Sequence, residues 1–385
     1  MVGKYPTDST CIRGGVQAAT FYLVKGLSRI DGLELHILTF RPSGWAGPDR
    51  VDQNGVCVHL MPPYPRFERL RSYRTYQNIF NERLAQIQPD IVHAQGAASD
   101  ALVALRSGYP TIVTVHGIRR EDQKYYGTRR ERLRCFFDSA LTEREVIGRT
   151  RYLIAISHYV TQYFAARFRP EFQCFYIPNA IDQQFFDLVT TSSQPIVLYV
   201  GSVIPRKRLT DLIMAFGRVI QLIPSAQLHI AGEVVTEPAY VDKVRRLIRE
   251  KNLEEHVQLL GALSETEVFR EFTNCSILVL PSSQETTPMV IGQAMAAGKP
   301  VLATPVGGVP EMLGEHGERG LLVPIGHVEE LARSIIDLLQ DAKLRERIGS
   351  AGRRFAQEYY HPSQVAMRTA EVYREVVTKE MAVNG

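Results

Sequence analysis

Residues 280–301 read LPSSQETTPMVIGQAMAAGKPV, and this stretch decides the fold class of the chain. The apolar run that ends at Leu280 predicts a buried strand, and a polar loop that carries Glu285 follows it. Pro288 suits the first turn of a helix, whose interior is small and apolar and therefore packs tightly. A second strand begins at Val301. This order of strand, loop, helix and strand is typical of a parallel α/β sheet.

The same alternation runs through the whole chain. Strands are predicted at Leu33–Phe40, Val56–Met61, Asp90–His93, Thr111–His116, Tyr152–Ile156 and Cys174–Ile177 in the first half, and at Ile196–Val200, Gln227–Ala231, Val257–Leu260, Ile277–Leu280, Val301–Ala303 and Gly320–Val323 in the second. Helices are predicted between the first-half strands at Val16–Ile30, Phe67–Ile87, Ser99–Ser107, Arg129–Gly148 and His158–Phe168. Strands that are nearly continuous Val/Ile/Leu runs indicate parallel sheets covered by helices on both faces.

The length of 385 residues predicts two domains. The polar stretch Asp187–Pro195, which has no periodicity, is the expected linker. We predict a doubly wound, Rossmann-like domain over residues 1–187, a second over 188–360 and a C-terminal helix over 361–385. The two parallel sheets are expected to face each other across a cleft lined by the carboxyl ends of their strands. Only residues 1–5 precede the loop region that contains the first Gly-rich turn, so either the first strand is very short or the chain begins downstream of its natural start.

Composition is that of a globular protein, with 45% apolar and 22% charged residues. No apolar run approaches the ~20 residues of a membrane-spanning helix, and no leader-like apolar core opens the chain, which predicts a cytoplasmic protein.

The net charge of +4 divides into +7 on residues 1–185 and −3 on the remainder, which favours an anionic partner for the first half. The five cysteines are dispersed, and neither a Cys-x-x-C pair nor a Cys/His cluster with metal-ligand spacing is recognised, so we expect no metal site.

Two stretches in the first half carry candidate ligand-binding groups. Gly14 and Gly15 open a predicted helix, where close backbone approach and free N–H groups suit a phosphate; the alternative is a plain turn. His116 ends a predicted strand at the cleft edge and is followed by a glycine. It either binds sugar hydroxyls or is satisfied by nearby backbone. No G-x-G-x-x-G follows a strand, which argues against an NAD or FAD enzyme.

Two stretches in the second half carry charge at strand ends. After the strand that ends at Val200, a loop contains Gly201, Ser202 and then three consecutive cations, of which Arg206 and Lys207 are candidates to neutralise a diphosphate leaving group. The alternative is solvated surface charge. In the opening stretch, Glu285 is a candidate acceptor for sugar hydroxyls, and the free N–H groups of Met289 and Val290 suit a phosphate.

At this point the chain resembles the family-4 glycosyltransferases, which are retaining enzymes of the two-domain GT-B fold. The family motifs appear in family order from residue 14 to about 310. They are Gly14-Gly15, His116, the segment 177–182 (Ile-Pro-Asn-Ala-Ile-Asp), Gly201-Ser202 with Lys207, and Glu285 through Val301. Two positions depart from the family pattern. Ser202 stands where the family usually has Arg, and Gln293 stands where it has a second Glu that accepts bonds from the donor's ribose hydroxyls. An amide oxygen still accepts them, but without charge.

The resemblance implies that the second domain binds a nucleotide-sugar donor and the first binds the acceptor. The predicted catalytic residues are His116, Lys207 and Glu285. The predicted donor-binding residues are Gly14, Gly15, Gly201, Ser202, Arg206, Gly232, Glu233, Thr287, Pro288, Met289, Val290 and Gln293. Arg119, Arg120 and Ser157 are candidates on the acceptor side. No cofactor is expected, because the nucleotide sugar is a substrate and cations replace a metal. The C-terminal helix is implied to pack back on the first domain.

We expect transfer of a hexose-type sugar, from a UDP-sugar before a GDP-sugar, to a glycan or lipid-linked acceptor. Two arginine clusters, 66–74 and 119–134, predict weak peripheral contact with an anionic membrane on its inner face; the alternative is a solvated arginine surface. Nucleic-acid binding is not expected, since no recognised module accompanies the charge. The rival functions are a nucleotide-sugar epimerase of the same fold and a non-catalytic sugar-nucleotide-binding protein.

Overall fold

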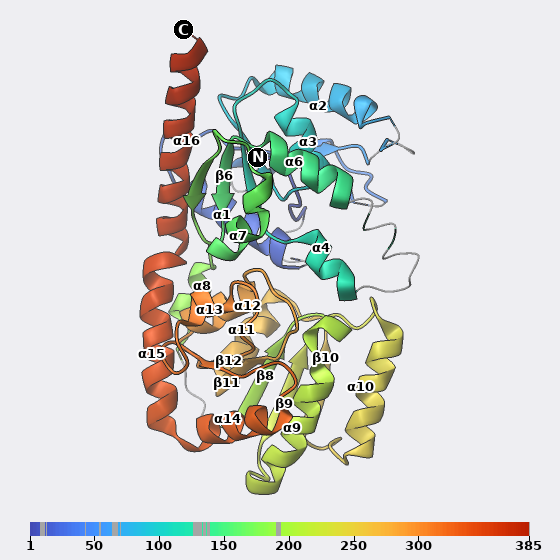
Figure 1. Ribbon diagram of the computed structural model, residues 1–385, viewed down its shortest axis with the longest axis vertical. Helices are drawn as coiled ribbons and strands as arrows, with labels where there is room; N and C mark the ends of the chain where they lie inside the picture. Colours follow the sequence, from blue (N-terminus) through green and yellow to red (C-terminus); the bar gives the residue numbers. More distant parts are fainter. Residues whose placement is uncertain are drawn as a thin grey trace. The chain divides into compact units, whose positions relative to one another are not determined.

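The computed structural model describes residues 1–7, 12, 14–42, 44–53, 55–63, 68–69, 71–125, 133, 136, 139–189 and 194–384. The chain forms two α/β units (Figure 1). The first comprises the described residues of ranges 1–124, 128–180 and 362–385, and the second those of 125–127 and 181–361. The unit boundary at Ala180/Ile181 precedes the predicted linker, because Phe185 and Phe186 pack into the core of the second unit.

The strands of the first unit are β1 (His36–Phe40), β2 (Arg50–Gln53), β3 (Val56–Met61), β4 (Val92–Gln95), β5 (Thr111–Val115), β6 (Tyr152–Ala155) and β7 (Gln173–Tyr176). They form the ladders β1-β3-β2 and β4-β5-β6-β7. Val2 bridges the two ladders, pairing in parallel with Leu38 on one side and Ala94 on the other. The start of the chain therefore supplies a single-residue strand position between β1 and β4.

One strand of the first unit is an antiparallel exception to the predicted parallel sheets. β2 was not predicted, and it pairs antiparallel with β3. Its residues alternate between exposed and half-buried, because it is an edge strand with a charged outer row that includes Arg50 and Asp52. Such a strand carries no apolar run and is hard to recognise from sequence.

The helices of the first unit are α1 (Gly15–Leu27), α2 (Arg74–Ile87), α3 (Ser99–Leu105), α4 (Arg119–Asp122), α6 (Arg144–Arg149), α7 (His158–Phe164) and α16 (Pro362–Asn384). Single turns of other helix types cover Gln123–Tyr125, Ser139–Glu143 and Ala165–Arg167. The predicted start of α2 at Phe67 was wrong, since the described residues Ser72 and Tyr73 have positive φ angles that a helix does not allow. Much of the predicted helix 129–148 lies outside the described residues.

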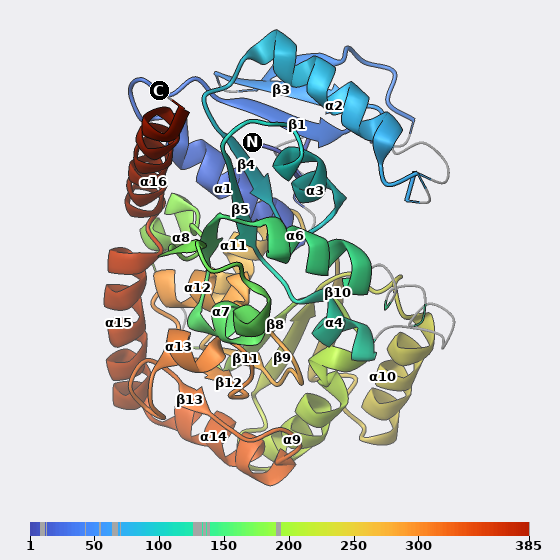
Figure 2. The same ribbon diagram turned by 45° about the horizontal axis from the view of Figure 1, so that its top comes forward.

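The C-terminal helix α16 belongs to the first unit and packs along α1 (Figure 2). Gly26 makes this close approach possible, because a Cβ there would lie 2.8 Å from the backbone oxygen of Pro362 and 2.9 Å from the Cβ of Ala366. Polar contacts add to the docking. Glu380 accepts hydrogen bonds from Arg151 at 2.7 Å and from the Tyr152 hydroxyl at 2.6 Å.

The second unit has one six-stranded parallel sheet of order β10-β9-β8-β11-β12-β13. Its strands are β8 (Ile196–Val200), β9 (Gln227–Ala231), β10 (Val257–Gly261), β11 (Ile277–Leu280), β12 (Val301–Ala303) and β13 (Leu321–Leu322). Its helices are α8 (Gln183–Asp187), α9 (Leu209–Leu222), α10 (Pro238–Glu250), α11 (Glu265–Asn274), α12 (Met289–Ala296), α13 (Val309–Leu313), α14 (Val328–Gln340) and α15 (Ala342–Tyr359).

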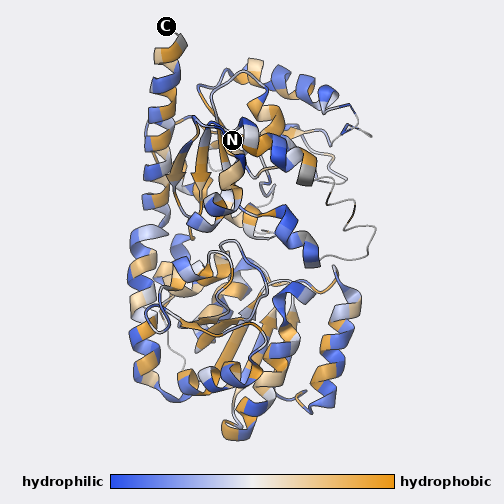
Figure 3. Ribbon diagram, in the orientation of Figure 1, coloured by the Kyte–Doolittle hydropathy of each residue, from blue (hydrophilic) through white to orange (hydrophobic). Residues whose placement is uncertain are grey.

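The strand order of this sheet reverses between β8 and β11. Right-handed crossovers then place α9 and α10 on one face and α12 on the other. Packing agrees, since α9 contacts α10 and α14, whereas α12 contacts α8 and α15. The central strands are apolar along their whole length (Figure 3), and β11 is completely buried. A reversal of strand order leaves a crevice at the carboxyl ends of β8 and β11, which is where α/β sheets bind ligands.

No helix in the described parts of the chain combines the length and the apolar character that crossing a membrane requires.

The close approach of α1 and α16 predicts how glycine substitutions act in the first unit. Gly26→Ala should destabilise the protein by about 1–3 kcal/mol, because overpacking against α16 outweighs the better helix propensity of alanine. Gly148→Ala is the matched control. It is helical and exposed, and its new Cβ would have only a contact at 4.0 Å, so it should be neutral or stabilising by up to about 1 kcal/mol. Urea unfolding measures both, and a Gly26→Ala variant as stable as the parent would contradict this packing.

Candidate active site

A buried group of charges lies at the carboxyl edge of β8 and β11. β8 ends at Val200, and the short 3-10 helix Pro205–Lys207 in the following loop carries Arg206 and Lys207. Glu285 comes from the loop after β11. The Lys207 ammonium donates to Oε1 of Glu285 at 2.5 Å, and the Arg206 guanidinium lies 3.3 Å from Oε2. The structure therefore brings together three predicted site residues, two of which, Lys207 and Glu285, are 78 positions apart in the chain.

The charges of this group do not cancel. Burial by itself raises the pKa of Glu285, but the Lys207 ammonium and then the Arg206 guanidinium lower it more strongly, so the net pKa lies below its usual value. Glu285 is therefore ionised at neutral pH, and the group of two cations and one carboxylate has one positive charge in excess. The side chains of Lys207 and Glu285 are only 11% and 7% exposed, so water screens this charge weakly.

Glycine backbones shape the loops beside the charges. The Gly201 N–H donates to Ala231 at 2.9 Å, and the Val203 N–H donates to Glu233 at 2.9 Å, so the loops after β8 and β9 lie side by side. A Cβ on Gly232 would stand 1.9 Å from the Gly201 oxygen, so no other residue fits there. The Glu233 carboxylate accepts from the N–H groups of Val235 and Thr236 in its own loop, at 2.7 and 2.5 Å. Gly201 and Gly232 thus have a structural role beside the donor-binding role predicted for them.

The loop after β11 is fixed on both sides and leads into α12. The Ser283 N–H donates to the Arg206 oxygen at 2.8 Å, and the Thr286 oxygen accepts from Gly308 at 2.8 Å. Pro288 caps α12 with extended backbone. As the first residues of a helix, Met289 and Val290 have N–H groups with no intrahelical acceptor.

Three further polar residues of the loops after β8 and β11 and of α12 were also predicted to bind the donor. The hydroxyl of Thr287 is buried without a hydrogen-bond partner among the described residues. Gln293 is half-buried on the second turn of α12, and Ser202 is half-buried in the loop after β8. Uncharged hydrogen-bond donors next to the excess positive charge of Arg206, Lys207 and Glu285 suit the binding of an anion.

In the first unit, His116 follows β5 and joins a polar group at the carboxyl edge of its sheet. Its Nε2 lies 2.6 Å from the Gln95 side-chain oxygen, which can only accept, so Nε2 carries the proton. Gln95 also lies 3.1 Å from Nε2 of His93, whose Nδ1 is 2.6 Å from the hydroxyl of Tyr373 on α16. His93, Gln95 and His116 line a cavity together with Thr114 and Asn179.

Burial keeps the imidazole of His116 neutral. It lowers the pKa of His116 to about 4, although a hydrogen bond with Asn179 acts in the opposite direction. Burial also holds the pKa of His93 well below its usual value. A neutral imidazole that donates through Nε2 has an acceptor nitrogen left at Nδ1. It therefore suits hydrogen bonds with hydroxyl groups rather than charge neutralisation.

The other first-unit candidates lie apart from this group. Gly14 precedes α1 with a φ of 82°, and a Cβ there would meet nothing within 4 Å. Arg119 and Arg120 are exposed on α4, where the Arg119 N–H donates to the buried carboxylate of Glu143 at 3.3 Å. Ser157 precedes α7, and its buried hydroxyl has no hydrogen-bond partner in the described chain.

Sequence reasoning missed His93 and Gln95. Both lie on β4, whose end at Gln95 is followed by Gly96, the same pattern that singled out His116 and Gly117 after β5. The predicted strand Asp90–His93 stopped two residues early, so Gln95 was assigned to a loop. Extending the strand to the glycine would have placed two polar side chains beside His116.

The search for metal-ligand spacing along the sequence found no Cys/His cluster, but three such side chains meet in the structure. Among the described residues, the ligand atoms of His36, Cys57 and His59 lie within 4.8 Å of one another. A search for spacing along the chain did not find them because they come from two paired strands.

Two family models match the chain. The model described as Glycosyltransferase Family 4 matches residues 13–185, and the model described as Glycosyl transferases group 1 matches residues 180–355. The chain is 27% identical over 378 residues to an uncharacterized glycosyltransferase of Methanocaldococcus jannaschii, covering 94% of this chain and 95% of that protein. It is 23% identical to a GDP-mannose-dependent alpha-(1-6)-phosphatidylinositol monomannoside mannosyltransferase of Mycobacterium tuberculosis, with 94% and 95% covered.

The fold has solved counterparts. Sucrose-phosphate synthase from Thermosynechococcus elongatus superposes with a TM-score of 0.78 at 22% identity, covering 95% of this chain and 94% of that one. The fold and the family matches together define a glycosyltransferase of the GT-B class, with two α/β domains and parallel sheets. The chain belongs to glycosyltransferase family 4, and the predicted family, fold and transferase class are confirmed.

The lowered pKa of His116 predicts a pH dependence of stability. Its folded pKa of about 4 lies below the ordinary 6.5, so the unfolded state binds more protons between these values. The free energy of unfolding should therefore fall as the pH drops from 6.5 to 4 and lose no more from this group below 4, with a total of up to about 3 kcal/mol. In His116→Gln this part of the slope should be missing.

Urea unfolding at several pH values between 4 and 7 measures this slope. His327→Gln is the control, since its side chain is 59% exposed, and it should keep the slope of the parent. Equal slopes in the parent and in His116→Gln would show that His116 is not held neutral by the fold.

Proposed function

We propose that the protein transfers a hexose-type sugar from a nucleoside-diphosphate sugar to a glycan or lipid-linked acceptor, with retention at the anomeric carbon and without a metal ion. The observation that carries the proposal is the buried group of Lys207, Arg206 and Glu285 at the carboxyl edge of the second sheet. UDP-sugars are the first choice of donor, on the family resemblance, and GDP-sugars are the second.

The first argument concerns the diphosphate. Breaking the bond between sugar and phosphate leaves negative charge on the diphosphate, and fixed positive charge in a poorly hydrated site lowers the energy of that state. Lys207 and Arg206 supply this charge, and the N–H groups of Met289 and Val290 supply donors at a helix start. Arg206 comes four residues after Ser202 and provides the guanidinium that the family pattern has at position 202.

The second argument concerns the sugar. Glu285 is ionised and is held by two cations that a diphosphate would also attract. We propose that the incoming phosphates share Lys207 and Arg206, so that the Glu285 oxygens can accept hydrogen bonds from sugar hydroxyls. Gln293, on the same helix as Met289, would accept from the ribose. His116 is proposed to hydrogen-bond sugar hydroxyls as a neutral imidazole.

The third argument concerns the metal and the proton. The chain contains no Asp-x-Asp sequence, and the cations described above can balance the leaving group instead. The proposed base is the leaving phosphate, which takes the proton of the acceptor hydroxyl as the new glycosidic bond forms. The sugar thus moves from phosphate oxygen to acceptor oxygen on the same face, and the proton ends on the nucleoside diphosphate.

Single substitutions in the charged group test the proposal. Lys207→Ala and Glu285→Gln should each lower the turnover number by about 10²-fold or more with chelator present, because each removes one charge-assisted contact from a buried site. Lys243→Ala, at an exposed position on α10, is the matched control and should keep the parent rate. Thermal unfolding of each variant separates a lost contact from a lost fold. Rates within a few-fold of the parent in both site variants would overturn these roles, and donor turnover without any acceptor would favour an epimerase.

A ligand screen tests the donor and acceptor. UDP-, GDP- and ADP-hexoses are compared by thermal shift, and a specific donor at 100 times its dissociation constant should add ~2.7 kcal/mol of stability.

We propose weak contact with an anionic membrane through the exposed Arg71 and Arg74, so the same protein is sedimented with anionic liposomes at moderate salt. A stabilising ADP-sugar alone would contradict the donor assignment, and full recovery in the supernatant would contradict the membrane contact.

A further inference from the structure

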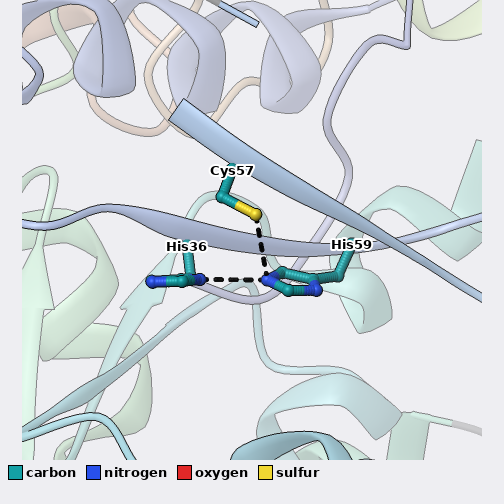
Figure 4. Close-up of side chains that lie close together, drawn as sticks. All are labelled: His36, Cys57 and His59. Atoms are coloured by element: carbon teal, nitrogen blue, oxygen red, sulfur yellow. Dashed lines mark hydrogen bonds between the residues drawn. The ribbon is translucent and has the colours of Figure 1, made fainter. Parts of the chain in front are cut away.

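Three potential metal ligands gather on one face of the β1–β3 pair, outside the carboxyl edge described above (Figure 4). His36 and Cys57 are register partners on neighbouring parallel strands, so their side chains leave the same face of the sheet. His59 follows Cys57 by two positions and shares that face. His36 Nδ1 lies 3.0 Å from His59 Nε2, and Cys57 Sγ lies 3.4 Å from the same nitrogen.

Two of these distances, 3.0 and 3.4 Å, are close to those between ligands that share one ion, and all three ligand atoms lie within 4.8 Å of one another. Zinc bonds of ~2.0–2.1 Å to nitrogen and ~2.3 Å to sulfur in tetrahedral geometry separate ligand atoms by roughly 3.3–3.6 Å. A thiolate with two imidazoles is a donor set that suits Zn²⁺ and its neighbours in the first transition row rather than Mg²⁺ or Ca²⁺. Small tilts of the two rings, which are stacked at 21°, would bring the three atoms to a common distance from an ion.

The surroundings of the cluster complete part of a metal site. Nε2 of His36 lies 3.0 Å from the Glu34 carboxylate, which must accept, so Nδ1 is the nitrogen with the free electron pair. A carboxylate on the far nitrogen is the usual outer partner of a metal-bound histidine. The sulfur of Cys57 accepts a hydrogen bond from Arg50 at 2.8 Å. It therefore already offers a lone pair, as a metal ligand must.

Protein contacts alone do not satisfy His59. Its Nδ1 is buried and has no hydrogen-bond partner in the described chain. This nitrogen can therefore take the ring proton when Nε2, which faces His36 and Cys57, binds an ion. His36 and Cys57 are only half-buried, which leaves the cluster reachable from solvent.

We propose that His36 Nδ1, Cys57 Sγ and His59 Nε2 form a three-ligand site for a transition-metal ion of the Zn²⁺ class, with water in the fourth position. On binding, the thiol proton leaves to solvent, and the proton that His59 Nε2 donates to His36 moves to His59 Nδ1. The site lies near the amino ends of β1 and β3, whereas Gln95 and His116 lie at the carboxyl ends of strands that run parallel to them. The ion therefore supports the first unit and takes no part in sugar transfer.

Cobalt titration of the full chain tests the proposal. The protein is stripped with chelator, kept reduced and titrated with Co²⁺, which gives a sulfur-to-metal absorption band when a thiolate binds. We expect one equivalent of Co²⁺ to give this band and Zn²⁺ to remove it. Cys57→Ser should abolish the band, and His59→Gln should weaken Zn²⁺ binding at least 10-fold. Cys174→Ser, which removes another half-buried thiol of the same unit, should leave both unchanged.

The outcomes are decisive because they do not depend on activity. Circular dichroism shows whether each variant folds, and Cys57→Ser, at a half-buried position, keeps the test available if His59→Gln does not fold. A band that persists in Cys57→Ser, or no band at one equivalent in the parent, would overturn the site and leave the cluster as a hydrogen-bonded histidine pair.

Discussion

The ion pair between Lys207 and Glu285 is the constraint on which the second unit's ligand-binding edge depends. A buried charge without a partner costs several kcal/mol, so neither side chain is stable there alone. Arg206 adds a second cation, which keeps the carboxylate ionised despite its burial and leaves positive charge in excess. The two loops that carry these residues are consequently held at one spacing. That spacing fixes the positive charge in the loops that lead to the start of α12, before any ligand arrives.

The fold supplies this arrangement through strand order and glycine. The order of the strands in the sheet reverses between β8 and β11. The loops after these two strands therefore leave the sheet in opposite directions, and the space between them holds the side chains of both loops. Gly232 then lets the loop after β9 lie directly on the Gly201 backbone, at a distance that any Cβ would prevent. Charged side chains can meet at this edge because glycine lets the backbones beneath them lie this close together. In physical terms the pattern is a buried group with positive charge in excess, at the edge where α/β sheets bind ligands.

Much of this could be predicted from the sequence, for reasons that particular residues show. Long apolar runs such as Ile196–Val200 predicted β8 to the residue, and the motif around Glu285 placed the acidic partner of Lys207 near the same edge. Exposed or irregular elements could not be predicted in this way. β2 has no apolar run, and α2 starts late because of the left-handed Ser72 and Tyr73. His93, Gln95 and Tyr373 meet across 280 positions, which no local pattern encodes. The roles of individual site residues stay predictions.

Strand direction also explains why the first unit holds two chemically different groups of histidines. At the carboxyl edge, His93 and His116 are tied to amide and hydroxyl partners, an arrangement that suits hydroxylic ligands. Near the amino ends of β1 and β3, His36 and His59 face each other and a thiol, an arrangement that suits an ion. Parallel strands keep these two ends apart by their own length, so the two groups have no ligand in common. An ion bound at one end would hold β1 against β3 without altering the charge at the other. The proposed ion site and the proposed metal-free sugar transfer are therefore compatible in one chain.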